Sequence, residues 1–274
     1  MVWKIGIVFF IALAYNSKPM FGFLIKKTFY DLWDNLFKVV LLNLVFLVFF
    51  VAALLIPPLF ESIPSLSLTL MGLGIVWCFV YLSGAALTLK ALSDYRSFGF
   101  ADFLGSLKSA WPAGLLLGIL FLLGLLLVRV IIPFYFSMES FFGLLLGTLL
   151  FWTLLVGILA LQFYFPIHSR LDTKLPKIIK KCFIIFLDNT PFCILTFLIS
   201  LVILVIPLPL LFPGPAGLLL FLDEALRLRI FKYDWLAANP NANHRKIPWD
   251  ALLFEEREKT GSRTLKGLIF PWKD

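Results

Sequence analysis

The chain alternates between long apolar stretches and short polar connectors, and the lengths of these stretches are its most informative feature. A helix needs about 20 apolar residues to cross a hydrocarbon core about 30 Å thick. Six stretches reach this length, and they lie near residues 39–58, 66–89, 112–134, 141–166, 188–208 and 212–231. Because short connectors join them in pairs, the pattern predicts an all-α, polytopic transmembrane helix bundle with about six spans arranged as three hairpins.

An amphipathic stretch precedes each predicted hairpin. Over residues 23–38, apolar side chains recur at i, i+3, i+4 and i+7, and charged side chains lie on the opposite helical face. Similar stretches occupy 98–111 and 175–186. We expect each to form an interfacial helix, here called an elbow helix, which lies along the membrane surface before the chain enters its hairpin.

These units predict three repeats of about 75 residues that begin near 23, 98 and 175. Sequence identity between the copies is weak, so the repeat rests on the pattern alone. The alternative is that regular loops in any polytopic protein produce the same spacing.

The basic residues predict the orientation of the hairpins. Every Lys and Arg except Arg129 lies in the first 38 residues, in 90–108, in 170–181 or after Leu226, and the connectors within the hairpins contain none. Cytoplasmic loops carry the excess of basic residues in membrane proteins. We therefore expect a multi-pass protein of the cell membrane whose N- and C-termini are both cytoplasmic.

The sixth stretch gives the weakest prediction of a span. Its purely apolar part covers only 216–222 and is preceded by four prolines, and such a segment also suits a broken or re-entrant element whose irregular backbone is covered by protein. Ten basic residues follow Leu226, and a full crossing of 212–231 keeps them on the cytoplasmic side with the others.

The composition supports a membrane protein. Of 274 residues, 61% are hydrophobic and 15% are charged, whereas soluble domains have about 45–50% apolar and about 25% charged residues. The net charge of +8 comes from residues beside apolar spans, so attraction to anionic lipid headgroups explains it better than nucleic-acid binding. The three cysteines have no metal-binding spacing and are expected to be buried thiols.

The two ends of the chain differ from its centre. We expect residues 1–231 to form the transmembrane domain, beginning with an interfacial segment at 1–38, and 232–274 to form a cytoplasmic tail. Residues 5–15 resemble the apolar core of a secretory signal, but four lysines follow, which favours an uncleaved segment at the cytoplasmic interface. In the tail, 249–259 suits a solvated helix, and the apolar residues 268–272 suit folding back or docking on a partner.

Three segments of the chain have a distinctive composition, namely the entry helix FYDLWDNLFKVVLLN at 29–43, the small-residue run GAALTLKAL at 84–92 and SFGFADFLGSLKSAW at 97–111. Together they resemble the YesL-like family of bacterial integral membrane proteins of unknown function. The resemblance covers roughly 23–230 and implies a bacterial cytoplasmic-membrane protein in a family whose members often look like accessories to carbohydrate uptake. The apolar N-terminus and the long tail depart from the family pattern, and no functional residue carries over.

Four ionisable residues at or near membrane depth are candidates for a site, because such groups are costly in hydrocarbon. Arg129 is expected near the outer interface, either snorkelling to headgroups or facing a cavity to meet an anionic substrate or Glu139. Asp188 suits either a helix cap or a cavity entrance. Asp223 and Glu224, with Asp223 four residues before Arg227, suit either an interfacial charge cluster or carboxylates that handle a proton or cation.

Other polar and small residues indicate helix packing. Lone amides such as Asn43 and Gln162 are expected to hydrogen-bond a neighbouring helix. Four glycines are expected at helix contacts, as two GxxxG pairs, namely Gly114 with Gly118 and Gly143 with Gly147. The two pairs lie at opposite depths of one hairpin, so we expect each to contact a helix of another repeat or another subunit. The alternative is a chance spacing of glycines.

The sequence contains no arrangement typical of a catalytic or metal site, so we expect no enzyme activity, no cofactor and no metal. Two functions remain. The first is a non-enzymatic accessory or scaffold subunit of a membrane transport complex, bound to a membrane-protein partner or to a second copy. The second is a small transporter or lipid-handling protein with a cavity between its hairpins. A deep polar cavity lined by the ionisable candidates would favour the second.

Overall fold

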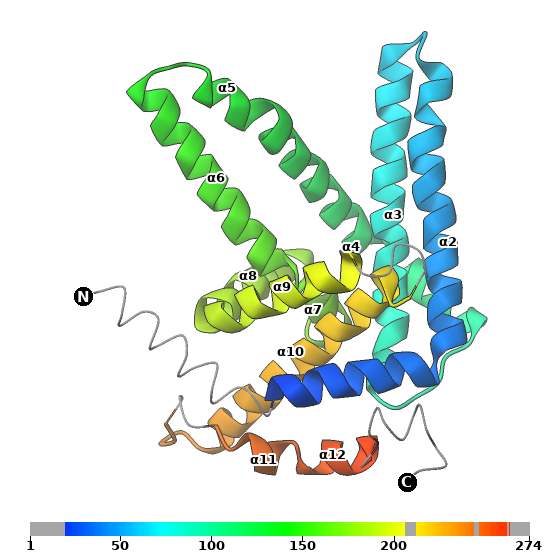
Figure 1. Cartoon of the computed structure of the whole chain (residues 1–274), viewed down its shortest axis with the longest axis vertical. Helices are drawn as coiled ribbons and strands as arrows, with labels where there is room; N and C mark the ends of the chain where they lie inside the picture. The colour runs from blue at the N-terminus through cyan, green and yellow to red at the C-terminus, as the bar shows by residue number, and fades with distance from the viewer. Residues whose placement is uncertain (1–19, 206–211, 244–246, 262, 264–274) are drawn as a thin grey trace. The chain divides into compact units, whose positions relative to one another are not determined.

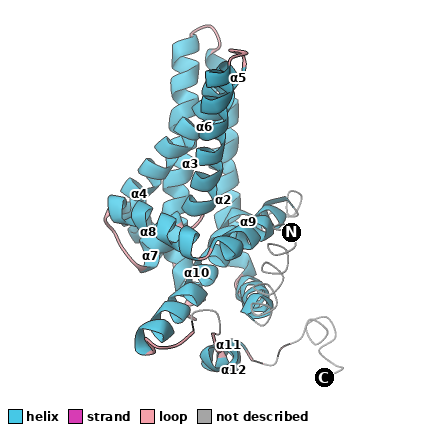
Figure 2. Cartoon of the chain, turned by 90° about the vertical axis from the view of Figure 1, so that its left-hand side faces the viewer, coloured by secondary structure: helices cyan, strands magenta, loops and turns pink. Residues whose placement is uncertain are grey.

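The computed structural model describes residues 20–205, 212–243, 247–261 and 263. These residues form helices joined by short turns and contain no β-strand, which confirms the predicted all-helical class (Figures 1 and 2). The chain divides into two compact units, one of Asn35–Asp223 and one of Met1–Asp34 with Glu224–Asp274. The predicted boundary between 231 and 232 therefore does not coincide with the division between the units.

The first hairpin of the unit 35–223 consists of α2 (Leu36–Leu55), the 3₁₀ turn η1 (Pro57–Phe60) and α3 (Pro64–Ser93) (Figure 1). Prolines mark both sides of the turn because proline fits the first helical positions but not a helix interior. The two helices approach closely, since a Cβ on Gly74 would lie 2.7 Å from the Cβ of Ala53.

The second hairpin consists of four helices and one π-helical turn: α4 (Phe100–Leu126), η2 (Leu127–Ile131), α5 (Ile132–Phe136), α6 (Phe141–Leu161) and α7 (Tyr164–Arg170). The hydroxyl of Ser140 caps α6 by accepting a hydrogen bond from the backbone N–H of Gly143, at 3.1 Å. Serine is a favoured residue at this position because its oxygen satisfies an amide that the helix leaves free.

The structure differs from the prediction at the second elbow helix. An interfacial helix over 98–111 was expected to end before Pro112, whereas α4 runs without a break from Phe100 through this proline. Contact with α3 keeps this part of α4 in line with the rest, because a Cβ on Gly84 would lie 2.9 Å from the Cα of Leu107. Tertiary packing here outweighs the tendency of proline to interrupt a helix.

A helix covers the range of the third predicted elbow helix, and its position at the interface stays a prediction. Helix α8 (Leu175–Asp188) meets α9 (Thr190–Val205) at an angle of 105°. The bend lies at Asn189, whose side-chain amide donates to the carbonyl of Ile185 at 3.3 Å. Pro191 follows directly and fits the first turn of the next helix. The residues that determine this bend therefore lie at the bend itself.

Among the described residues, four helical segments are long and apolar enough to cross a membrane, and α8 with α9 makes a fifth if the bent pair is one span. The four are Leu36–Phe60, Pro64–Ser93, Phe100–Phe136 and Phe141–Arg170. Helix α10 (Gly214–Ala238) is not among them, since four charged residues lie between 223 and 229. The part of the chain that the structure describes is thus a helical, membrane-type bundle with four or five helices of spanning length, and six spans stay a prediction.

The N-terminus of α10 is held by a buried residue of α2. The Asn43 amide donates to the carbonyl of Pro213 at 2.7 Å and accepts from the backbone N–H of Ala216 at 2.8 Å. Gly214 has a φ of +59°, and a Cβ there would lie 2.6 Å from the Asn43 amide nitrogen, so glycine is required. Asn43 lies seven residues into α2, or about 10 Å along the helix. Helix α10 therefore begins part of the way along α2.

The second unit contains the helix over residues 20–34, the rest of α10, α11 (Trp249–Leu252) and α12 (Phe254–Thr260). The tail was expected to form a solvated helix, but Trp249 and Leu253 are buried and the buried Glu256 forms an ion pair with Arg227 at 2.8 Å. The tail therefore packs on the unit along one face. The expectations for 5–15 and 268–272 lie outside the described residues.

We predict that Asn43→Ala destabilises the protein by about 2 kcal/mol, because it leaves the buried backbone N–H of Ala216 without a partner. The measurement is thermal or denaturant unfolding of the full chain in mild detergent. Leu44→Ala, at a half-exposed neighbouring position, is the control. Equal stability of the two variants would show that Asn43 does not hold α10.

Candidate functional site

Asp223 lies at the centre of a buried hydrogen-bonded cluster in the unit 35–223. The guanidinium of Arg170 binds it through Nε at 2.8 Å and through a terminal nitrogen at 2.5 Å. The same guanidinium donates to the Asp94 carboxylate at 3.0 Å and to the Ser93 hydroxyl at 2.9 Å. Ser169 adds a bond of 3.3 Å to Asp223. We call these five residues the Arg170 network.

The Arg170 network joins three helices that are distant in sequence. Arg170 is the last residue of α7, Ser93 and Asp94 lie at the end of α3, and Asp223 lies within α10. The side chain of Asp223 is only 4% exposed, and that of Arg170 only 10%. A bidentate Arg–carboxylate pair is directional and strong, and removing one partner leaves an uncompensated buried charge. The network therefore acts as a structural clamp.

Glu224, the next residue of α10, belongs to the other unit. Its carboxylate accepts from the Thr28 hydroxyl at 2.6 Å and pairs with Lys27 at 3.3 Å, and Lys27 also pairs with Asp31 one helical turn away. Both Lys27 and Glu224 are buried. Buried charges are stable only when paired and hydrogen-bonded, and this group meets that requirement. Glu224 therefore fixes α10 to the helix over 20–34.

One predicted pairing is wrong. The spacing of four residues paired Asp223 with Arg227, whereas the structure pairs Asp223 with Arg170 and Arg227 with Glu256. Arg170 was not a candidate from the sequence. The sequence did signal that Asp223, a carboxylate in an apolar stretch, needs a basic partner. It did not identify that partner, because several basic residues were equally suitable.

The other two ionisable candidates lie apart from these clusters. Arg129 is exposed in the π-helical turn η2 and makes no hydrogen bond or ion pair with any described residue. Asp188 is exposed at the end of α8 and accepts from the Asn189 side chain at 2.9 Å. Within the unit 35–223, neither Arg129 nor Asp188 is therefore part of the network around Asp223.

The glycine pairs contact different partners. A Cβ on Gly114 would lie 2.5 Å from the Cα of Val80, and one on Gly118 would lie 3.0 Å from the Cα of Val76. Helix α3 of the first hairpin therefore packs directly against both glycines. Gly143 and Gly147 differ from the expectation, since they face Tyr135 and Phe136 of their own hairpin. The short turn after α5 brings its last residues over the start of α6.

The lone amides bind neighbouring helices as expected. Asn43 binds the start of α10, and the Gln162 amide donates to the carbonyl of Cys193 in α9 at 3.0 Å. These bonds satisfy polar groups that would otherwise face hydrocarbon.

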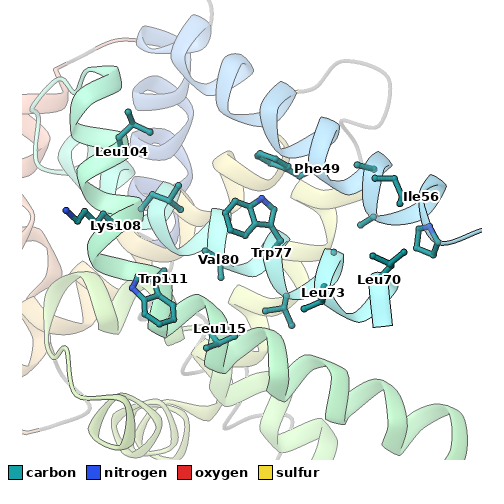
Figure 3. A pocket seen from close by; sticks show the side chains of 16 residues that line it. Phe49, Ile56, Leu70, Leu73, Trp77, Val80, Leu104, Lys108, Trp111 and Leu115 are labelled. Carbon is teal, nitrogen blue, oxygen red and sulfur yellow. The ribbon is translucent and has the colours of Figure 1, made fainter. Parts of the chain in front are cut away.

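An apolar groove of about 770 Å³ lies between α2, α3 and α4 (Figure 3). Phe49 and Trp77 line its middle, and Lys108 and Trp111 lie at one end. We call it the α2–α4 groove. Its lining is almost entirely hydrocarbon and aromatic, so it suits an apolar occupant rather than a hydrated ion or a polar solute.

Among the described residues, no group of three His, Cys, Asp or Glu side chains is arranged to hold a metal ion. The described free cysteines Cys78, Cys182 and Cys193 are buried, as the sequence predicted. The structure therefore offers a clamp, a helix-capping amide and an apolar groove as its distinctive features.

We predict that Arg170→Met lowers the free energy of unfolding by about 3–5 kcal/mol, because Asp223 is left buried without its partner. Adding Asp223→Leu should recover most of the loss, since an apolar pair of similar volume can replace a buried ion pair. Unfolding in detergent is the measurement. Arg129→Met, at an exposed arginine, should change stability by less than about 0.5 kcal/mol. A loss for Arg170→Met no larger than for this control would contradict the clamp.

Comparison of the chain with models of protein families, with curated proteins and with solved structures finds no match.

Proposed function

We propose that this protein is a non-enzymatic accessory or scaffold subunit of a membrane transport complex in a bacterial cytoplasmic membrane. The observation that carries the proposal is the unequal burial of its two long hairpins. In Pro64–Ser93, 39% of the most apolar window is buried within the protein, against 6% in Phe100–Phe136. A membrane helix whose most apolar part is so little buried within its own chain is suited to pack, along that part, on another membrane protein.

Both long helices of the second hairpin carry exposed apolar side chains. In Figure 1, α5 and α6 lie away from α2 and α3, and α4 contacts α3 mainly along its first half. Phe121, Trp152 and Leu149 are among its exposed side chains. A Cβ on Gly157 would meet no atom within 4 Å, so a partner's helix has room to approach the backbone of α6. Close packing at small residues is a main source of helix association in lipid.

The state of the ionisable residues supports this proposal over transport. Transport required Arg129, Asp188, Asp223 or Glu224 to line one water-accessible space. Instead, Asp223 is bound within the Arg170 network, and Glu224 is bound to Thr28 and Lys27. Buried carboxylates that already have partners contribute to the stability of the fold, and they are not open to a transported ion.

The proposal includes a topology. The helices α2, α3, α4–α5 and α6 cross the membrane, and the elbow helices over 20–34 and in α8 lie at the cytoplasmic interface. The third pair, α9 and α10, enters and leaves on the cytoplasmic side as a re-entrant element. Support comes from Asn43, which holds the start of α10 only about 10 Å along α2, well short of the roughly 30 Å needed to cross.

A re-entrant pair satisfies the distribution of charge as well as a full crossing does. In either arrangement the chain returns to the side from which it entered, so the basic residues after Leu226 stay in the cytoplasm. Membership in the YesL-like family is part of the proposal, and the accessory role implied by that resemblance agrees with it.

We predict that Gly157→Trp dissociates the complex. The full chain, tagged and solubilised in mild detergent, should migrate in native electrophoresis as a species larger than the monomer, and Gly157→Trp should return it to the monomer. Val48→Trp, at an exposed position of α2, is the matched control and should leave the larger species intact. Mass spectrometry then identifies the partner, and two differently tagged copies test whether it is a second copy of this chain. Monomeric migration of the unmodified chain would contradict the proposal.

A further inference from the structure

Lys108 gives the α2–α4 groove a polar end. It is the charged residue among those that line the groove, and it is exposed on α4. It makes no hydrogen bond or ion pair with any residue that the structure describes. Trp111 follows one helical turn later, and Figure 3 shows both side chains at the end of the groove opposite Ile56 and Leu70. Tryptophan is enriched at the membrane–water interface, where its ring is half in hydrocarbon.

The length of the groove corresponds to one leaflet. Because Leu107 packs on Gly84, Lys108 lies at about the level of Gly84 on α3, while Leu70 lines the far end. The fourteen residues between these levels span about 21 Å of helix. One leaflet has about 15 Å of hydrocarbon and about 5–8 Å of headgroup region. The groove is therefore long enough to hold a single phospholipid with its phosphate at Lys108 and its acyl chain reaching Leu70.

The size and chemical character of the groove also favour a phospholipid, and one with an anionic headgroup. Its volume of about 770 Å³ is within the range of small-molecule sites, and its walls are apolar from Trp77 to Ile56. A lysine near a membrane surface attracts anionic lipid by about 1 kcal/mol, which is several-fold in affinity. A zwitterionic headgroup brings its own cation beside the lysine and loses this advantage.

We propose that the α2–α4 groove is a binding site for an anionic phospholipid, with the phosphate at Lys108 and one acyl chain lying against Trp77 and Phe49. This site is separate from the proposed docking surface on α6. It therefore stands whether or not the second hairpin binds a partner.

The test uses the full chain in mild detergent, titrated with dioleoyl phosphatidylglycerol or dioleoyl phosphatidylcholine and followed by native mass spectrometry. We expect one phosphatidylglycerol to bind more tightly than any phosphatidylcholine. Lys108→Glu should weaken that binding about tenfold or more, because attraction becomes repulsion. Lys180→Glu makes the same change of charge at an exposed lysine of α8 and should leave it unaltered.

A second pair of variants tests the apolar part of the site. Ala52 lines the groove, so Ala52→Phe should fill it and weaken the binding of phosphatidylglycerol. Val48→Phe adds the same ring to an exposed position of α2 that does not line the groove, and it should bind like the unmodified chain. Unfolding curves show whether each variant is folded.

Three outcomes would overturn the proposal. Equal binding of the two lipids, or equal effects of Lys108→Glu and Lys180→Glu, would mean that the groove holds only unselected bilayer lipid. An unchanged affinity in a folded Ala52→Phe variant would place the anionic lipid elsewhere on the surface.

Discussion

The arrangement of this chain depends on keeping cationic side chains out of hydrocarbon unless they are paired. A lysine or arginine at the centre of a bilayer costs about 2.5–3.5 kcal/mol or more. The basic residues therefore cluster at hairpin ends and in the tail. Two buried cations each pair with a carboxylate, Arg170 with Asp223 and Lys27 with Glu224. The charged residues of α10 are thus bound where they can be satisfied, and this limits how α10 can lie in a membrane.

The features that local chemistry determines were predictable from the sequence. The helix starts at Pro64 and after Ser140, and the bend between α8 and α9, follow from prolines and capping side chains within a few residues of each break. The second elbow helix was not predictable in the same way. Pro112 looked like a helix start, but contact between α4 and α3 at Gly84 and Gly114 keeps the helix continuous, and that contact links residues about thirty apart.

In the candidate site, too, neighbouring residues determine some features and residues distant in sequence determine others. Asp223 and Glu224 are conspicuous in the sequence because carboxylates in an apolar stretch need partners. Their partners, Arg170 and Lys27, lie far away along the chain, and spacing alone favoured the nearer Arg227. The capping role of Asn43 was foreseen as a bond to a neighbouring helix, but which helix it would bind depended on the fold. Long-range pairing is the information that a periodic pattern does not contain.

In the proposed topology, the basic loops share one face of the membrane while two hairpins cross it and the third pair returns without crossing. Single cysteines in a chain lacking its three native cysteines, labelled in intact cells by an impermeant maleimide, test this directly. The account predicts that Glu61→Cys and Met138→Cys react from outside, that Lys177→Cys and Asp250→Cys react only after the membrane is opened, and that Phe212→Cys does not react from outside. Labelling of Lys177→Cys in intact cells would contradict the orientation, and labelling of Phe212→Cys would show that the third pair crosses fully.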